Sequence, residues 1–149
     1  MTNIRWGIVG TGSIATAFAH SIKYSNNSSL EAVYGRNESK LKDFCNKFEV
    51  EDINEPNNLF TADHIDAIYI ATPHSTHYEY CLSAIRNKKH ILCEKPLTVN
   101  HLESMVLLNL AKESNVFLME AFMYRTHPQT ANILDSLDVF QDSKEEIII

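Results

Sequence analysis

The sequence predicts an α/β fold with a doubly wound parallel sheet, in which helices cover both faces of the strands. Two observations support this prediction. Short apolar runs alternate with longer amphipathic segments, as in consecutive βαβ units. All four glycines lie at or before Gly35, and three of the four prolines, at positions 73, 96 and 128, follow predicted strands. These prolines mark the carboxyl edge of the sheet, where open α/β sheets bind ligands.

The first third of the chain predicts two strand–helix pairs, over residues 4–9, 13–24, 30–34 and 38–48. The first strand is an apolar run. The helix after it places Ile14, Phe18 and Ile22 on one face, because residues four apart stack along a helix. The polar stretch that follows the second helix predicts only a short edge strand near Val50 and one helical turn around Leu59.

The remaining strands are predicted at residues 67–71, 90–93 and 116–119, with helices over residues 76–87 and 100–114. Thr76 with Glu79, and Asn100 with Glu103, have the spacing of a capping box, in which two side chains bind the first helical amides reciprocally. Pro128 opens a last helix. We expect five or six strands in all, with an order that reverses beside the first strand.

The segment Gly10-Thr11-Gly12-Ser13-Ile14-Ala15 joins the first predicted strand to the first helix. This is the position of the G-x-G-x-x-G/A fingerprint of dinucleotide-binding Rossmann folds. Gly10 permits the tight turn, Gly12 lets the backbone approach a pyrophosphate, and Ala15 lets the helix sit close to the strand. The amides at the helix start then bind phosphate. The alternative is an ordinary glycine turn.

The end of the second predicted strand indicates which dinucleotide is bound. NAD-binding domains usually place an acidic side chain there to bind the ribose hydroxyls, whereas this chain has Tyr34-Gly35-Arg36. The Arg36 guanidinium can pair with a 2′-phosphate, and Lys40, one helical turn later, adds a second positive charge. We therefore expect NADP(H) in preference to NAD(H). The alternative is that both cations are solvated surface side chains.

The segment from Ala71 to His77 connects a buried strand to a helix at the point where the strand order is expected to reverse. We expect Ala71, Thr72, Pro73 and His74 to lie against the cofactor. His77 either contacts the cofactor as well or serves as a cap or packing residue. No acidic or thiol ligand supports the two histidines at a suitable spacing, so no metal site is expected.

Glu94-Lys95-Pro96 places two ionisable groups at the end of a strand, next to a rigid proline. We expect Glu94 and Lys95 to contact the cofactor, and Lys95 to be the catalytic group. Its ammonium can orient a substrate hydroxyl or the nicotinamide carboxamide, and desolvation would let it assist proton transfer. The alternative for Lys95 is a structural ion pair with Glu94 or another acid.

Composition limits the classes of partner. The net charge of −6 argues against a nucleic-acid or anionic-membrane surface, so we expect a small-molecule partner. No window approaches the ~18 continuous apolar residues that span a bilayer. Cys45, Cys81 and Cys93 lack the spacing of a metal site or a disulfide framework, and we expect them to be reduced thiols in a cytoplasmic protein.

Four segments recur in this order in the glucose-fructose oxidoreductase/inositol dehydrogenase-like (Gfo/Idh/MocA) family, namely residues 10–15, 72–77, 94–96 and 120–128. The last, Glu120-Ala121-Phe122-Met123-Tyr124-Arg125 followed by His127-Pro128, is most similar to the branch with dimeric dihydrodiol dehydrogenases and NADP-dependent D-xylose dehydrogenases. The sequence resembles this family from residue 4 to about residue 137.

The resemblance implies the Rossmann domain of a two-domain NADP-dependent oxidoreductase that transfers hydride at a sugar or vicinal-diol carbon. It implies that Lys95 lies near the nicotinamide and that residues 120–125, Met123 among them, border the same pocket. A second α/β domain follows in the family, with substrate contacts, a tyrosine or histidine acid/base and a dimer surface. We expect residues 1–137 to form the Rossmann domain and residues 138–149 to be the truncated start of the second domain or a disordered tail.

Three functions are therefore open. The chain can be the cofactor half of a sugar or diol dehydrogenase that is inactive alone, or a non-catalytic NADP-responsive regulatory module. A third hypothesis is an interaction domain with an emptied pocket. Glu94-Lys95-Pro96 favours an enzymatic origin. We also expect a homo-oligomer, because the surface that a second domain would cover is exposed and residues 147–149 can pair as an edge strand.

Overall fold

A computed structural model describes residues 3–142 of the 149. The strands within this range are β1 (Ile4–Val9), β2 (Ser28–Tyr34), β3 (Glu51–Ile53), β4 (Ala67–Ile70), β5 (His90–Cys93) and β6 (Leu118–Glu120). The α-helices are α1 (Ser13–Ile22), α2 (Glu38–Phe48), α3 (Pro56–Thr61), α4 (His77–Arg86), α5 (His101–Ser114) and α6 (Pro128–Asp142). The short 3-10 turns η1 (His74–Thr76) and η2 (Met123–Thr126) precede α4 and α6.

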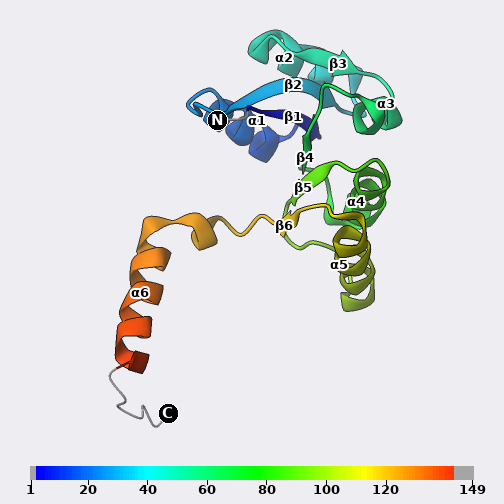
Figure 1. Ribbon diagram of the computed structural model, residues 1–149. Coiled ribbons are helices and arrows are strands. Elements are labelled where there is room, and N and C mark those ends of the chain that lie inside the picture. The colour runs from blue at the N-terminus through cyan, green and yellow to red at the C-terminus, as the bar shows by residue number, and fades with distance from the viewer. Residues whose placement is uncertain (1–2, 143–149) are drawn as a thin grey trace.

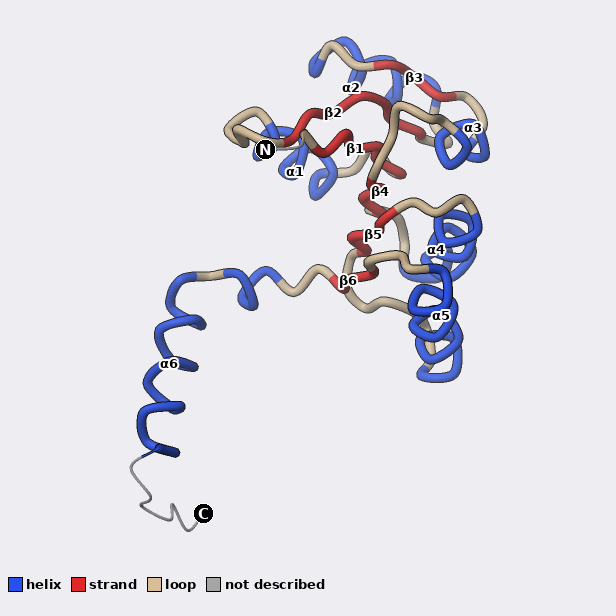
Figure 2. The backbone as a smooth tube through the Cα atoms, in the orientation of Figure 1, coloured by secondary structure: helices blue, strands red, loops and turns tan. Residues whose placement is uncertain are grey.

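The sheet is parallel throughout, in the order β3-β2-β1-β4-β5-β6 (Figure 1, Figure 2). The order reverses beside β1, because the chain first builds β2 and β3 on one side and then crosses to build β4, β5 and β6 on the other. This topology confirms the predicted doubly wound α/β fold. The carboxyl ends of β1 and β4 therefore lie together at the point of reversal, where such sheets bind ligands.

Helices cover the two faces of the sheet unequally. On one face, α3, α4 and α5 pack over buried strand residues such as Ile68 and Ile91. On the other face, α1 and α2 pack over residues of β1 and β2 such as Ile8. Beyond α1, the half-buried side chains of Leu92 and Met119 border an apolar cavity. The last helix, α6, extends away from the sheet (Figure 1).

Two predicted capping boxes have different outcomes. The Asn100 side chain accepts a hydrogen bond from the Glu103 amide at 3.0 Å, which confirms Asn100 as the N-cap of α5. The reciprocal half of the box differs, because Glu103 Oε1 accepts from the Asn100 side-chain amide at 2.9 Å and not from its backbone amide. The box predicted for Thr76 and Glu79 is wrong. The Thr76 hydroxyl instead donates to the carbonyl oxygen of Pro73 at 2.8 Å, because the turn η1 precedes α4.

The predicted strands are present, with shifted ends. The edge strand expected near Val50 is β3, and the helical turn expected around Leu59 is α3. The strand expected at residues 116–119 is found at Leu118–Glu120, because β6 pairs with residues 91–93 of β5. Strand ends depend on which neighbour supplies hydrogen bonds, and apolar runs do not specify this.

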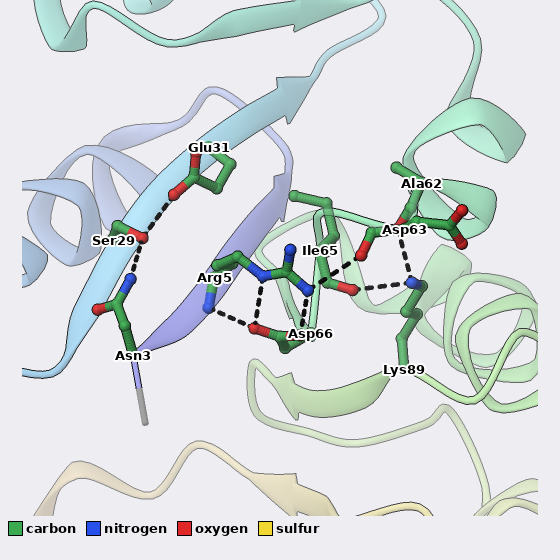
Figure 3. A network of polar contacts seen from close by, with 9 residues as sticks. All are labelled: Asn3, Arg5, Ser29, Glu31, Ala62, Asp63, Ile65, Asp66 and Lys89. Atoms are coloured by element: carbon green, nitrogen blue, oxygen red, sulfur yellow. Dashed lines mark hydrogen bonds and ion pairs between the residues drawn. The ribbon is translucent and has the colours of Figure 1, made fainter. Parts of the chain in front are cut away.

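A polar network ties the amino edge of the sheet together (Figure 3). The Arg5 guanidinium in β1 donates from Nε to Asp66 Oδ2 at 2.9 Å and from Nη2 to Asp66 Oδ1 at 2.7 Å. This pairing lowers the pKa of Asp66 to about 2. Lys89 Nζ donates to the carbonyl oxygens of Ala62 and Ile65 at 2.7 and 2.8 Å. The network joins β1 to the loop before β4 and to the segment before β5, at the edge opposite the predicted site.

The predicted domain boundary at residue 137 lies inside α6, which runs on to Asp142, and that boundary stays a prediction. Residues 143–149, with the predicted edge strand at 147–149, lie outside the described residues. Along residues 3–142, no helix has both the length and the apolar character needed to cross a bilayer.

Candidate functional site

A cavity of about 350 Å³ opens at the carboxyl ends of β1, β2 and β4. The parallel register brings these strands together, since Val9 pairs with Tyr34 on one side and with Ile70 on the other. The loops after these three strands therefore supply most of the wall, and β2, α2 and α4 supply the rest. The lining residues are Gly10, Thr11, Gly12, Tyr34, Gly35, Arg36, Asn37, Lys40, Ala71, Thr72, Pro73 and Tyr80. The cavity gathers most of the residues that the sequence marked as cofactor-binding.

Gly10 occupies a position that requires glycine. Its φ of +119° is one that L side chains rarely adopt, and an added Cβ would lie 2.4 Å from the carbonyl oxygen of Ala71. The Gly10 amide donates to the carbonyl oxygen of Tyr34 at 2.8 Å. The turn after β1 is therefore fixed against β2 and against the end of β4.

The start of α1 is suited to an anion. An added Cβ at Gly12 would meet no atom within 4 Å, so the backbone there faces open space. Gly12 is the N-cap of α1, and no side chain caps the helix. The amides of Ser13 and Ile14 consequently lack intrahelical partners, and with the helix dipole they favour a phosphate group. Ala15 is fully buried, as expected for close packing of α1 on the sheet.

Arg36 and Lys40 place two exposed cations on the wall of the same cavity. Asn37 caps α2 by accepting a hydrogen bond from the Lys40 amide at 2.9 Å, which fixes where the helix begins and where Lys40 is carried. Gly35 leaves room for a neighbour, since an added Cβ would lie 2.7 Å from Thr11 Cγ2. The cations and the amides of the glycine turn therefore border one cavity.

The loop after β4 contributes Thr72 and Pro73 to the cavity, and His74 is exposed beside it. His77 differs, because its side chain is only 1% exposed. Its Nε2 lies 2.8 Å from the carbonyl oxygen of Thr72, and its Nδ1 lies 2.9 Å from that of Pro96. Both ring nitrogens are engaged by the protein itself, which favours the packing alternative for His77 over direct contact with a cofactor.

A second cavity, of about 530 Å³ and mostly apolar, lies between α1 and the segment after β6. It contains three further residues predicted to bind a cofactor or implied to do so by the resemblance, Ile14, Glu94 and Met123. Other lining residues are Ala17, Phe18, Ser21, Tyr69, Leu92, Met119, Ala121, Phe122 and Thr126. Since Gly12 borders the first cavity and Ile14 the second, the two cavities flank the start of α1.

Glu94 is a buried carboxylate at the edge of the second cavity. It accepts a hydrogen bond from the Tyr69 hydroxyl at 2.5 Å. Burial and this hydrogen bond raise the pKa of Tyr69 well above its usual range. The Tyr69 ring also stacks on Phe18, with ring centroids 4.0 Å apart. In the described part of the chain no ion pair joins Lys95 to Glu94 or to another acid, which argues against the ion-pair alternative for Lys95.

Lys95 is exposed, but the segment that carries it is held in place. On the amino-terminal side, the Glu94 carboxylate is held by the hydrogen bond from Tyr69. On the other, the carbonyl oxygen of Pro96 contacts His77, and the Leu97 amide donates to Glu120 Oε1 at 2.8 Å. The Lys95 ammonium is therefore accessible to a ligand while its backbone is fixed at the carboxyl edge.

None of the three cysteines lines either of these two cavities. Cys45, Cys81 and Cys93 are free and buried, and burial raises the pKa of Cys45 to about 11. Among the residues that the structure describes, no three His, Cys, Asp or Glu side chains gather as a metal ion would require.

The family model described as "Oxidoreductase family, NAD-binding Rossmann fold" (GFO_IDH_MocA) matches residues 4–122. The chain belongs to this family. Membership confirms the resemblance found in the sequence and makes the chain the NAD(P)-binding Rossmann part of an oxidoreductase of the Gfo/Idh/MocA family.

Curated relatives within the family include Oxidoreductase P35 of Formosa agariphila, 38% identical over 92% of this chain, and trans-1,2-dihydrobenzene-1,2-diol dehydrogenase of Xenopus laevis, 35% identical over 83%. The chain covers 43% and 38% of their lengths. The 3-ketoreductase KijD10 of Actinomadura kijaniata, solved with NADP, superposes with a TM-score of 0.84 at 32% identity, over 92% of this chain and 44% of that chain. The chain thus spans less than half the length of these family members.

Sequence reasoning missed residues that shape the site from inside the fold. Tyr69 lies in an otherwise aliphatic strand. Its position there could have indicated a polar partner, because a buried hydroxyl group requires a hydrogen bond. Glu120 belonged to a family motif, but its bond to the loop after β5 had no local signature. Tyr34 and Tyr80 line the first cavity from two elements far apart in the sequence.

Proposed function

We propose that this chain binds NADP(H) as the cofactor domain of an oxidoreductase that transfers hydride at a carbon of a sugar or vicinal diol. The observation that carries the proposal is one cavity bordered both by the glycine turn and by Arg36 and Lys40. The turn serves the pyrophosphate of either dinucleotide, whereas two cations at the end of β2 suit the 2′-phosphate of NADP. The structure of the family member KijD10 with NADP supports this choice.

The residues present fit such a cofactor. The uncapped amides of α1 and the open space at Gly12 suit the pyrophosphate. We propose that the adenosine end lies toward Arg36 and Lys40 and the nicotinamide end toward Lys95. The remaining proposed contacts are Gly10, Thr11, Ser13, Ile14, Ala71, Thr72, Pro73, His74, Glu94 and Met123, and His77 acts indirectly.

The nicotinamide, when bound, supplies the carbon that carries the hydride. The Lys95 ammonium donates a hydrogen bond to the substrate oxygen and stabilises the negative charge that develops there as hydride is exchanged. The proton that this oxygen gains or loses passes to or from an acid/base group, which the family resemblance places in the second domain. The names of relatives support both substrate classes: a glucose-6-phosphate 3-dehydrogenase and a D-xylose 1-dehydrogenase for sugars, and a trans-1,2-dihydrobenzene-1,2-diol dehydrogenase for diols. Both classes carry the adjacent hydroxyls that a single ammonium can bind.

Titration of the purified chain with NADPH and with NADH, followed by nicotinamide fluorescence, tests the proposal. NADPH is expected to bind at least tenfold more tightly. Tighter binding of NADH would contradict the role of Arg36 and Lys40 but not the dinucleotide site itself. Failure of both cofactors to bind would instead support an interaction domain with an emptied pocket.

We further propose that residues 1–137 are the binding unit and that residues 138–149 lead toward a second domain, so that these 149 residues alone hold the cofactor without turnover. The relatives support this, since the chain covers 43% of Oxidoreductase P35. An NADP-responsive regulatory module is the second candidate. Oxidation of NADPH by the chain in the presence of sugar-derived ketones would contradict both non-catalytic proposals.

We also propose that the chain self-associates. Ile133, Leu134 and Leu137 of α6 are between 48% and 55% exposed, and part of the sheet beside Met119 lies under an open apolar cavity. Exposed apolar surface of this kind favours association. Sedimentation velocity should detect a dimer or larger species at micromolar concentration, and replacing Ile133 and Leu137 by serine should shift it toward monomer. A wild-type monomer at all concentrations would contradict this.

A further inference from the structure

His77 connects two loops that come from neighbouring strands. Thr72 follows β4, Pro96 follows β5, and the carbonyl oxygens of both face the same imidazole ring at 2.8 and 2.9 Å. Carbonyl oxygens only accept hydrogen bonds, so the ring must donate. A neutral ring donates to one carbonyl, and an imidazolium donates to both. Either way, the ring lies between the two loops and is shielded from solvent.

The first of these loops is closed by hydrogen bonds between its own residues. The Thr76 hydroxyl lies 2.9 Å from Thr72 Oγ1 and 2.8 Å from the carbonyl oxygen of Pro73. His77 begins α4 directly after this closed loop. Its ring therefore starts from a fixed position and extends from the β4 side to the β5 side.

The second loop carries Lys95. Glu94 is held through Tyr69, and Leu97 is held through Glu120. Between these two anchors, the contact from His77 to the Pro96 carbonyl is what ties the segment to the β4 loop, which lines the first cavity.

We propose that His77 is a positioning residue, which sets Lys95 at a fixed place relative to the loop at Thr72 and so aligns the nicotinamide end of the site with the phosphate end. The inference rests on the proposed function and deepens it. His77 touches neither cofactor nor substrate and acts through the backbone of its two partners. An indirect contact of this kind can still affect the site, because in enzymes a misplacement of about 1 Å caused by a distant mutation can lower the rate about 10²-fold.

The test compares two ligands on the full chain. Adenosine 2′,5′-bisphosphate occupies only the adenosine end, whereas NADPH spans both ends. His77→Leu, which keeps bulk but has no donor, should bind NADPH about tenfold more weakly and the bisphosphate within twofold of wild type. His77→Gln, which retains an amide donor, should recover part of the NADPH affinity. His64→Ala, at an exposed histidine that lines neither cavity, is the matched control and should leave the affinity for both ligands within twofold of wild type.

Equal loss of both ligands in His77→Leu would overturn the proposal, because it would indicate a general effect on the fold. Unchanged NADPH binding would overturn it as well. Where His77→Leu does not fold, nuclear magnetic resonance of the wild-type chain replaces it: a ring N–H of His77 that exchanges slowly with solvent supports the contact, and a rapidly exchanging one overturns it. A wild-type chain that binds neither ligand would refute the proposed function. The resonance measurement would in that case still test whether the His77 ring donates a hydrogen bond to one of the two loops.

Discussion

Gly10 and Gly12 are two residues apart, yet the structure predicts opposite consequences for the same substitution. In Gly10→Ala the methyl group would lie 2.4 Å from the carbonyl oxygen of Ala71, at a φ of +119°. The backbone conformation alone costs of order 1–3 kcal/mol for a residue with a side chain. The clash adds to it, because the partner is backbone and cannot rotate away. We expect a loss of about 2–4 kcal/mol of unfolding free energy.

In Gly12→Ala the methyl group meets no atom within 4 Å, and the φ of −79° suits alanine. The expected loss of stability is about 0.5–1 kcal/mol, the usual difference between glycine and alanine at an N-cap. The methyl group enters the space proposed for the pyrophosphate, so NADPH affinity should fall at least tenfold.

Urea unfolding followed by circular dichroism measures the first effect, and NADPH titration of the folded variants measures the second. A Gly10→Ala variant as stable as wild type would refute the strain argument. A Gly12→Ala variant that is folded and binds NADPH normally would show that no ligand approaches the backbone there.

Three further changes test other parts of the structure. Arg36→Ala should weaken NADPH binding tenfold to a hundredfold, or about 1.5–3 kcal/mol, with NADH nearly unchanged in fluorescence titrations, because only NADPH carries the 2′-phosphate; equal losses would indicate a structural role. Tyr69→Phe keeps the ring but removes the hydroxyl that donates to buried Glu94, so urea unfolding should show a loss of about 1–3 kcal/mol in the free energy of unfolding. An unchanged free energy of unfolding would mean that the carboxylate has another partner. The folded-state pKa of Asp66 is lowered to about 2, so the stability it contributes is present above about pH 4 and is lost as the pH falls toward 2. Thermal unfolding should show this loss in wild type and a smaller one in Asp66→Asn, and parallel pH profiles would count against it.

The fold and the first cavity could be predicted from the sequence because their signals are local. A glycine turn between an apolar strand and an amphipathic helix, such as Gly10 to Ala15, determines its own surroundings within a few residues. Arg36 and Lys40 line the same cavity as the glycine turn because the loop after β2 and the first turn of α2 carry them, and the place of β2 in the strand order was predicted.

The supports of Lys95 could not be predicted, because they depend on pairs of residues brought together by the sheet. Tyr69 and Glu94 are 25 positions apart and meet only through the β4–β5 register. For the same reason, the sequence left two roles open for His77, contact with the cofactor or a role as a cap or packing residue. Its burial depends on the position of the Pro96 carbonyl, which is 19 residues away. The failed capping box at Thr76 has a different origin, because the turn η1 occupies residues 74–76, and 3-10 turns are frequent at the amino ends of α-helices.

The contact between Gly35 and Thr11 constrains how this protein can change its preferred dinucleotide. An acidic side chain after β2 is the usual way to bind the ribose hydroxyls of NAD, and at position 35 its Cβ would lie 2.7 Å from Thr11 Cγ2. Thr11→Ala would remove both close atoms and leave only the Cβ of residue 11, 3.6 Å away. An acid at position 35 therefore requires the Thr11 side chain to rotate or to be shortened, whereas the change at Thr11 brings no new specificity by itself. A mutant library that varies only the end of β2 would test each acid with the Thr11 methyl group still in place, so positions 11 and 35 are best varied together.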